Sequence, residues 1–170
     1  ITQDDLNQLG SLPWPRSYYA RVIDYLKESG AKVISFDVFF PRHSTDKSED
    51  DMMAEATKKA GNVIYPVFTP SAKRFTSPVV HDLVYNIEEL IQYAPQAHIN
   101  VIPDKDGIIR RVPISINYNG KNFWALSIST AAKYFNTDEE SLIRQMNIPQ
   151  DGRGSLFINY ADVENEIGCY

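Results

Sequence analysis

The feature that most constrains the fold is a helix that begins at a proline and leads through a glycine into a strongly apolar strand. Pro15 suits a first helical turn, where the missing N–H of proline is not needed, and Gly30 provides the stop. The apolar side chains between them recur at helical spacing: Tyr19, Val22, Ile23 and Leu26. We predict a helix from about Pro15 to Ser29, with Trp14 buried at its start, packed on a strand from Lys32 to Val38.

A second helix and strand follow the first pair. Ser48 is the predicted start of a helix that runs to Ala60 and stops at Gly61. The run 62–68 is short, apolar and bounded by turn formers, as in a strand that is buried on both faces, and Pro66 suggests the end of that strand or a sheet edge. Because a strand, a helix and a strand occur in succession, we expect the two strands to be parallel.

The middle of the chain changes in composition. The stretch 69–82 is rich in Pro, Ser, Lys and Arg and has no periodicity, so we predict a long loop that is either functional or disordered. Asn86 is then the predicted cap of a short helix that ends before Pro95.

An antiparallel part comes last. Asn119-Gly120 favours a tight hairpin turn between strands at 108–118 and 121–123, because both residues tolerate a positive φ. Helices at 124–135 and 138–146 and a strand at 155–160 complete the pattern. The prediction is therefore a single α/β domain over residues 1–170. Its central mixed sheet is parallel in the N-terminal part, contains an antiparallel hairpin in the C-terminal part, and is flanked by helices.

Composition excludes several classes of function. The 170 residues are 43% hydrophobic, which is enough for one core, and the formal charge of −5 argues against binding to nucleic acid. Cys169 is the only cysteine, so an internal disulfide is excluded. The three histidines are dispersed, and the sequence has no nucleophile elbow and no phosphate-binding glycine loop. We expect no catalytic residues, no metal and no cofactor.

Several short motifs, in order and spacing, resemble one family. They are Leu9-Gly10, Trp14-Pro15-Arg16, Gly30-Ala31-Lys32-Val33-Ile34, Phe36-Asp37, Phe40, Asp50-Asp51, the run from Asp104 to Pro113, and Ala125-Leu126-Ser127. From about Leu9 to Tyr160 the chain resembles a CHASE2 domain, the extracytoplasmic sensor module of bacterial histidine kinases, adenylate or diguanylate cyclases, and serine/threonine kinases.

The resemblance implies a function and a cellular context. In that family a membrane helix precedes the domain and several follow it, so we expect a piece of a membrane-anchored receptor that is periplasmic or on the cell surface. It would respond to an unknown small molecule or envelope stimulus and pass a conformational signal to a cytoplasmic kinase or cyclase domain. A homodimer is compatible with this role. The fragment itself would not be an enzyme.

Asp37 is the first candidate site residue. It follows a strand, where open α/β sheets place ligand groups, although an Asp there can also simply cap a turn. One alternative function is therefore a small hydrolase or phosphatase-like enzyme that uses Asp37 with Asp104 or Asp106. A dehalogenase-type phosphatase would need a second Asp two residues on, where this chain has Phe39. Another alternative is a structural or dimerisation module that binds nothing small.

A charged run supplies four more candidates. Asp104 and Asp106 precede Gly107 without the spacing of a calcium loop, so a turn between strands is the favoured interpretation. In a strand, Arg110 and Arg111 point to opposite faces, and one of them needs a carboxylate partner. We predict a salt bridge from at least one of these arginines to Asp37, Asp104 or Asp106, which would be either structural or a clamp for an anion.

Arg16 completes the candidate set, either as an anion-binding donor at a helix start or as a solvated or locally paired side chain. We expect any ligand to be small and anionic and to bind near the C-terminal end of the 32–38 strand. Asp50 and Asp51 count against an anion, so that the alternatives are a cation or no ligand at all. The candidate ligand-binding residues are thus Arg16, Asp37, Asp104, Asp106, Arg110 and Arg111.

Overall fold

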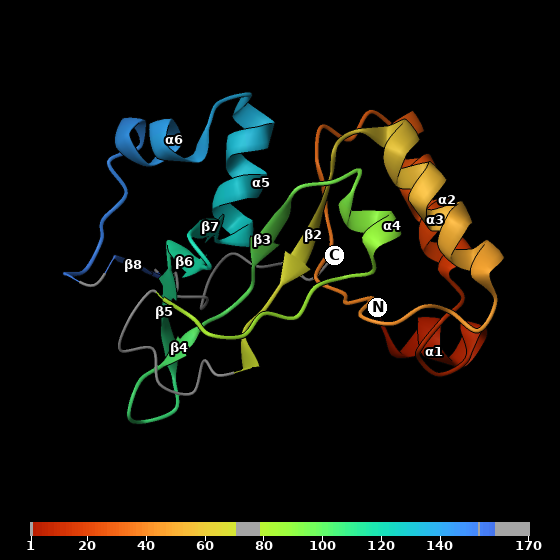
Figure 1. Cartoon of the computed structure of the whole chain (residues 1–170), viewed down its shortest axis with the longest axis horizontal. Helices are drawn as coiled ribbons and strands as arrows, with labels where there is room; N and C mark the ends of the chain where they lie inside the picture. The colour runs from red at the N-terminus through yellow and green to blue at the C-terminus, as the bar shows by residue number, and fades with distance from the viewer. Residues whose placement is uncertain (1, 71–78, 153, 159–170) are drawn as a thin grey trace.

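A computed structural model describes residues 2–70, 79–152 and 154–158 (Figure 1). Within these ranges helices and strands alternate in the first half, and the second half begins with strands. In chain order the elements are α1 (Gln3–Leu9), α2 (Arg16–Glu28), β1 (Ile34–Ser35), α3 (Lys47–Ala60), β2 (Val63–Val67), α4 (Glu88–Ile91), β3 (Gln96–His98), β4 (Ile102–Pro103), β5 (Ile109–Pro113), β6 (Ser115–Tyr118), β7 (Lys121–Trp124), α5 (Leu126–Phe135), α6 (Glu139–Gln145) and β8 (Ser155–Phe157).

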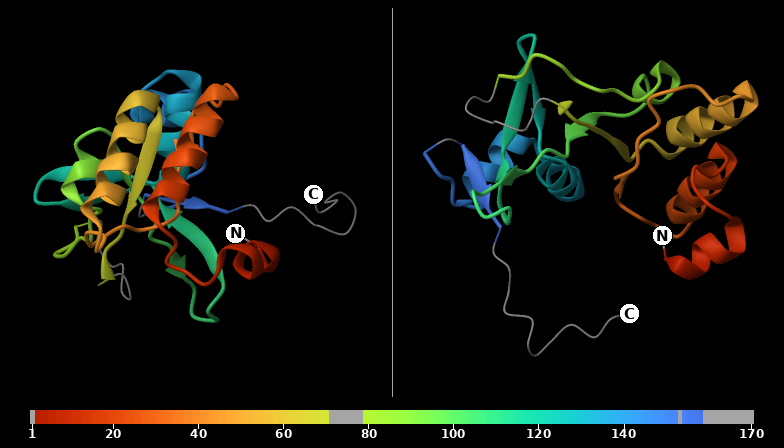
Figure 2. Two further views of the ribbon diagram at one scale, coloured as in Figure 1. Left: turned by 90° about the vertical axis from the view of Figure 1, so that its right-hand side faces the viewer. Right: turned by 90° about the horizontal axis from the view of Figure 1, so that it is seen from below.

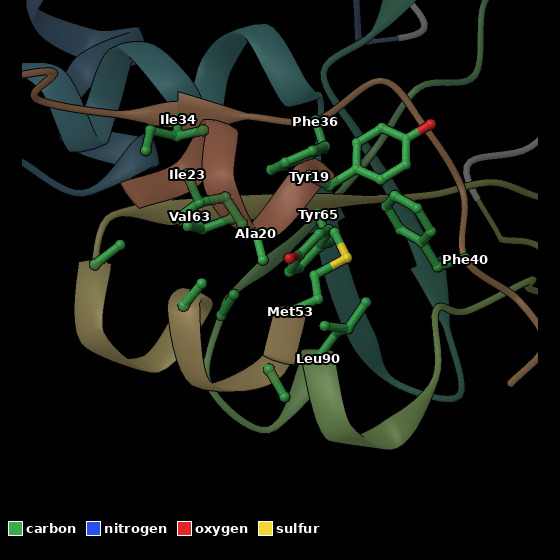
Figure 3. Packing of buried hydrophobic residues seen from close by; sticks show 14 of the residues in the cluster. Tyr19, Ala20, Ile23, Ile34, Phe36, Phe40, Met53, Val63, Tyr65 and Leu90 are labelled. Carbon is green, nitrogen blue, oxygen red and sulfur yellow. The ribbon is translucent and has the colours of Figure 1, made fainter. Parts of the chain in front are cut away.

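The first half is a parallel sheet between two layers of helices. Its strands have the order β1-β2-β3, and every residue of β2 is buried, as predicted for a strand covered on both faces. Ile34 and Phe36 point into a core shared with α2, α3 and α4 (Figure 3). Ser35, on the opposite face, bonds to Thr130 of α5 at 2.6 Å. This alternation places α5 across the sheet from α2 and α3, as Figures 1 and 2 show.

Pro66 lies in the central strand, so the expected sheet edge at this residue was wrong. Just beyond β1, the Phe36 N–H donates to the Ile64 carbonyl at 3.0 Å. The next donor in the ladder would be residue 66, and proline has no N–H. The Asn86 side chain links the two segments instead. Its amide donates to the Pro66 carbonyl at 2.7 Å, and its side-chain oxygen accepts from the Phe40 N–H at 2.8 Å. The chain after Phe36 thereby leaves the sheet.

The second half is antiparallel and is built from two small sheets. β6 and β7 form the predicted hairpin, with Asn119 and Gly120 at positive φ. β5 pairs with β4 and β8, so the expected long strand at 108–118 is divided between two sheets. A parallel bridge between His98 and Ala125 connects the hairpin to β3. The α/β class, with a parallel first part and an antiparallel second part, is confirmed.

Most helices agree with the predictions, but their caps differ in two places. α2, α5 and α6 lie where expected, and Asp138 caps α6 by accepting from the Ser141 N–H. The predicted cap at Ser48 was wrong, because Asp46 caps α3 and accepts from the Ser48 N–H. Asn86 is no cap either, since its side chain bridges the two extended segments described above.

Three further expectations concern the ends and the long loop. α1 was not predicted, although Thr2 and Asp5 form a capping box at its start. Trp14 is half-buried and packs on the core around Tyr19. Residues 71–78 of the predicted loop, and the end of the predicted strand 155–160, lie outside the described residues.

Candidate functional site

A pocket lies at the carboxyl end of β1, where the chain leaves the sheet. Its volume is about 680 Å³. Three segments line it: residues 12–16 before and at the start of α2, residues 38–46 after β1, and the first turn of α3. This position agrees with the rule that α/β sheets bind ligands beyond the carboxyl ends of their strands.

A buried ion pair between α2 and α3 stands beside the pocket. Asp50 is fully buried in the first turn of α3, and Arg16, the first residue of α2, is also buried. The Arg16 guanidinium donates to the Asp50 carboxylate and to the Arg42 carbonyl. Because an unpaired buried charge is strongly unfavourable, this pair fixes the starts of both helices relative to the 38–46 segment.

Asp50 also holds the chain that leads into α3. The Ser44 N–H donates to both of its carboxylate oxygens at 3.1 and 3.2 Å, and His43 Nδ1 lies 3.1 Å from Asp50 Oδ2. The His43 side chain itself is largely exposed and is also 3.8 Å from Glu89 of α4. The buried carboxylate thus contacts both the start of α2 and the segment that leads into α3, which makes it the organising charge of this region.

Acidic side chains occupy the starts of both helices at the pocket. Glu49 Oε2 accepts from the Ser17 N–H in the first turn of α2 at 2.6 Å. Asp46 accepts from the Ser48 N–H at the start of α3, and the Ser48 side chain together with this N–H lowers the pKa of Asp46. The positive ends of both helix dipoles are therefore already satisfied by carboxylates.

Aromatic rings form much of the remaining pocket wall. Tyr19 and Phe40 meet edge to face with centroids 5.0 Å apart, and Trp14 lies 6.5 Å from Tyr19. The Arg16 guanidinium carbon is 5.5 Å from the centre of the Phe40 ring. Burial raises the pKa of the Tyr19 phenol, so this side chain stays neutral at physiological pH.

The four candidates from the charged run form a separate cluster on the β4–β5 hairpin. Arg111 lies 2.8 Å from Asp104, and Arg110 lies 3.0 Å from Asp104 and 2.9 Å from Asp106. The predicted salt bridge is confirmed, although both arginines reach the same Asp104. Hydrogen bonds to these carboxylates raise the pKa of Arg110, and the Arg110 side chain lowers the pKa of Asp106.

This hairpin cluster is explained by the turn that contains it. Asp104, Asp106 and Gly107 form the corner between β4 and β5, with Gly107 at a φ of 83°. The Ile108 N–H donates to Asp106, as in a side-chain-stabilised turn. The cluster does not include Asp37 or Arg16, so the six candidate residues occupy three different places in the fold.

Asp37 is exposed after β1. It is not among the residues that line the pocket. Within residues 2–70, 79–152 and 154–158 no hydrogen bond or ion pair to Asp37 is found, so the second acid or base that the enzyme alternative needs is not at its side. In the same ranges, no three His, Cys, Asp or Glu side chains are grouped as metal ligands.

Sequence reasoning located this region but missed the residues that organise it. Glu49, Asp50 and His43 were not candidates, and Asp50 was considered only as a charge that would repel anions. Arg16 and Asp50 are 34 positions apart, so no local pattern joins them. The available signal was an acid in the first turn of a helix, which normally indicates a solvated residue that favours the dipole.

Comparison with known proteins gives one match. A family model described as the CHASE2 domain matches residues 1–167, which is nearly the whole chain. No curated protein and no solved structure matches it. Among the described residues, no helix is long and apolar enough to cross a membrane.

Proposed function

The chain belongs to the CHASE2 domain family, and from this premise we propose that it is the sensing part of a bacterial transmembrane receptor. CHASE2 is a family of extracytoplasmic sensory domains. The finer proposal is that this domain lies outside the cytoplasmic membrane, binds a small molecule or responds to an envelope condition, and changes the activity of a cytoplasmic kinase or cyclase domain in the same receptor. The family match over residues 1–167 is the observation that carries it.

We assign sensing to the pocket at the carboxyl end of β1. It has the size of a small-molecule site and joins apolar walls to a few oriented polar groups, which is the usual make-up of such sites. Of the six residues predicted from the sequence, Arg16 belongs to this pocket. We assign a structural role in the hairpin to Asp104, Asp106, Arg110 and Arg111. We assign no role in the pocket or in the hairpin to Asp37.

In this proposal, the segment between α1 and α2 transmits the conformational change from the pocket to the chain that precedes the domain. Residues 12–15 form one wall of the pocket, and the Trp14 indole donates to the Gly10 carbonyl at 2.7 Å. α1 itself has no buried residue, so little packing opposes its movement. A ligand that contacts Trp14 therefore biases the position of α1, and with it the chain that precedes the domain. Two copies in one receptor would respond in the same way.

The test uses the full-length protein in its own membrane. Alkaline phosphatase and a fluorescent protein that folds only in the cytoplasm are fused in turn after residue 158. We expect phosphatase activity and no fluorescence. Output activity is then measured in membranes from cells that carry the wild-type receptor or the Trp14→Ala variant, and we expect the variant to shift the basal output.

Fluorescence without phosphatase activity would contradict the proposed location. An exposed aromatic residue that is distant from the pocket, Tyr134 of α5, provides the control. The Tyr134→Ala control should leave the output at the wild-type level. If Trp14→Ala also leaves it at that level, the pocket has no part in signalling.

A further inference from the structure

The charges around the pocket restrict what can bind there. Arg16 is a cation at the pocket wall, but its charge is cancelled by the buried Asp50. Arg42 contributes one further positive charge from an exposed position. Asp46 and Glu49 contribute two negative charges to the lining. With His43 counted as neutral and the buried Asp50 counted together with the lining, negative charges outnumber positive ones by one.

The helix-start N–H groups described at this site are already bonded to carboxylates of the protein. The first-turn N–H groups of a helix are the usual anion ligands, and here the Ser17 N–H is bonded to Glu49 and the Ser48 N–H to Asp46. The Ser44 N–H and the Arg16 guanidinium both donate to Asp50. To reach these groups, an incoming carboxylate or phosphate would have to displace a carboxylate of the protein, and of the described lining residues only the exposed Arg42 side chain adds a further positive charge.

The walls of the pocket favour a cation with an apolar body. Trp14 is half-buried beside the pocket, and Phe39 and three prolines also line it. Aromatic faces attract cations within about 6 Å of the ring centre, and Arg16 already uses the Phe40 ring in this way at 5.5 Å. Glu49 is half-buried, and its Oε1 accepts no hydrogen bond within the described residues.

Accepting the sensor function proposed above, we propose that this pocket binds an amphipathic organic cation. The ammonium group of the ligand pairs with Glu49, and its apolar or aromatic body packs against Trp14 and Phe39. This assignment reverses the anionic ligand expected from the sequence, because Asp46 and Glu49 line the pocket and bond to the helix N–H groups that an anion would use.

Three probes of similar size test the charge of the ligand. Phenethylammonium, 2-phenylethanol and phenylacetate share an aromatic body and differ in the polar group. Isothermal titration calorimetry at pH 7 on the 170-residue chain should give binding of phenethylammonium, with the alcohol and the carboxylate at least about tenfold weaker.

Two variants and one matched control test the site. Glu49→Gln keeps an acceptor for the Ser17 N–H and removes the charge, and it should weaken phenethylammonium binding by about tenfold or more. Trp14→Leu should weaken phenethylammonium and 2-phenylethanol together. Asp51→Asn removes an exposed acid of the same helix that bonds to Lys47 and does not line the pocket, and it should change nothing. Unfolding midpoints of all variants verify that each is folded.

Four results would overturn the proposal: binding of phenylacetate as tight as that of phenethylammonium, an unchanged affinity in Glu49→Gln, an equal loss in Asp51→Asn, or no binding of any probe to the folded chain. The fusion experiment on the full-length receptor does not depend on these probes. A correct membrane topology with no cation binding would therefore reject the ligand class alone, whereas a cytoplasmic location would reject the sensor.

Discussion

The two halves of this domain hold their charges in opposite ways. In the parallel half, the arginine and the aspartate that meet are 34 residues apart, and both are buried beside a core of fifteen side chains. In the antiparallel half, the arginines bond to two aspartates four to seven positions away on the same hairpin, partly in solvent, and Arg111 also approaches a distant carboxylate, that of Asp151 at 3.8 Å. The hydrophobic clusters of this half contain only four buried residues each. Charges that are neighbours in the sequence satisfy one another within a turn, whereas charges brought together by tertiary structure fix the elements around a pocket.

The largest change in stability is expected when the buried ion pair between Arg16 and Asp50 is broken. Asp50→Ala leaves the Arg16 guanidinium buried without a carboxylate, and we expect a loss of about 3–5 kcal/mol in the free energy of unfolding. Urea denaturation measures it. Asp51→Ala, the exposed neighbour that bonds to Lys47, is the control and should stay close to the wild type. Equal stabilities for the two variants would mean that the buried pair does not organise the parallel half.

The core of the parallel half is tested next. Ile23 on α2 is fully buried among α3 and β-strand residues, so Ile23→Ala should cost about 2–5 kcal/mol, the range for a large-to-small change in a core. Val22, its exposed neighbour on the same helix, provides the matched control as Val22→Ala. An unfolding midpoint that Ile23→Ala leaves unchanged would contradict the packing shown in Figure 3.

The boundary between the two halves should be sensitive to acid. His98 ends β3, bridges to Ala125, and is fully buried, and this burial lowers its pKa from 6.5 to about 4. The folded state therefore binds fewer protons than the unfolded state between these values, and stability falls as the pH drops from about 6.5 to about 4.

The measurement is the unfolding free energy as a function of pH for the wild type and for His98→Gln. The variant should lose the part of the pH dependence in this window that comes from His98. Identical slopes for the two proteins would show that His98 does not control the acid sensitivity.

The smallest expected effect concerns the hairpin. Asp104→Asn removes the carboxylate that both arginines share, and exposed pairs of this kind contribute about 1 kcal/mol or less to stability. Added salt should reduce the difference between this variant and the wild type, because exposed pairs are screened. A loss as large as that of Asp50→Ala would remove the contrast between the two halves.

Local signals made much of the fold predictable. Pro15 and the apolar stripe after it placed α2, Asn119-Gly120 placed the β6–β7 hairpin, and Asp138 placed α6. Each of these features is decided by residues within a few positions of one another. The division of 108–118 into two strands could not be predicted from the sequence, because it depends on pairing with the strands β4, β7 and β8.

The candidate site was predictable in position and not in composition. Its place beyond β1 follows from the general rule for parallel sheets, which needs only the order of the elements. The pairing of Arg16 with Asp50 depends on how α2 and α3 cross, which no spacing in the sequence reports. The role of Asn86 was missed for the same reason, since its partners Phe40 and Pro66 belong to two other segments.

The absence of an N–H at Pro66 also has a consequence for the pocket, because the β1–β2 pairing stops next to it. With a donor at that position the ladder from β2 would extend to the Phe36 carbonyl and draw the following residues, which now line the pocket, against the sheet. The dimensions of the pocket thus depend on a residue outside its lining. We therefore expect that exchanging Pro66 for a residue with an N–H would narrow the pocket, although no side chain of its lining would change.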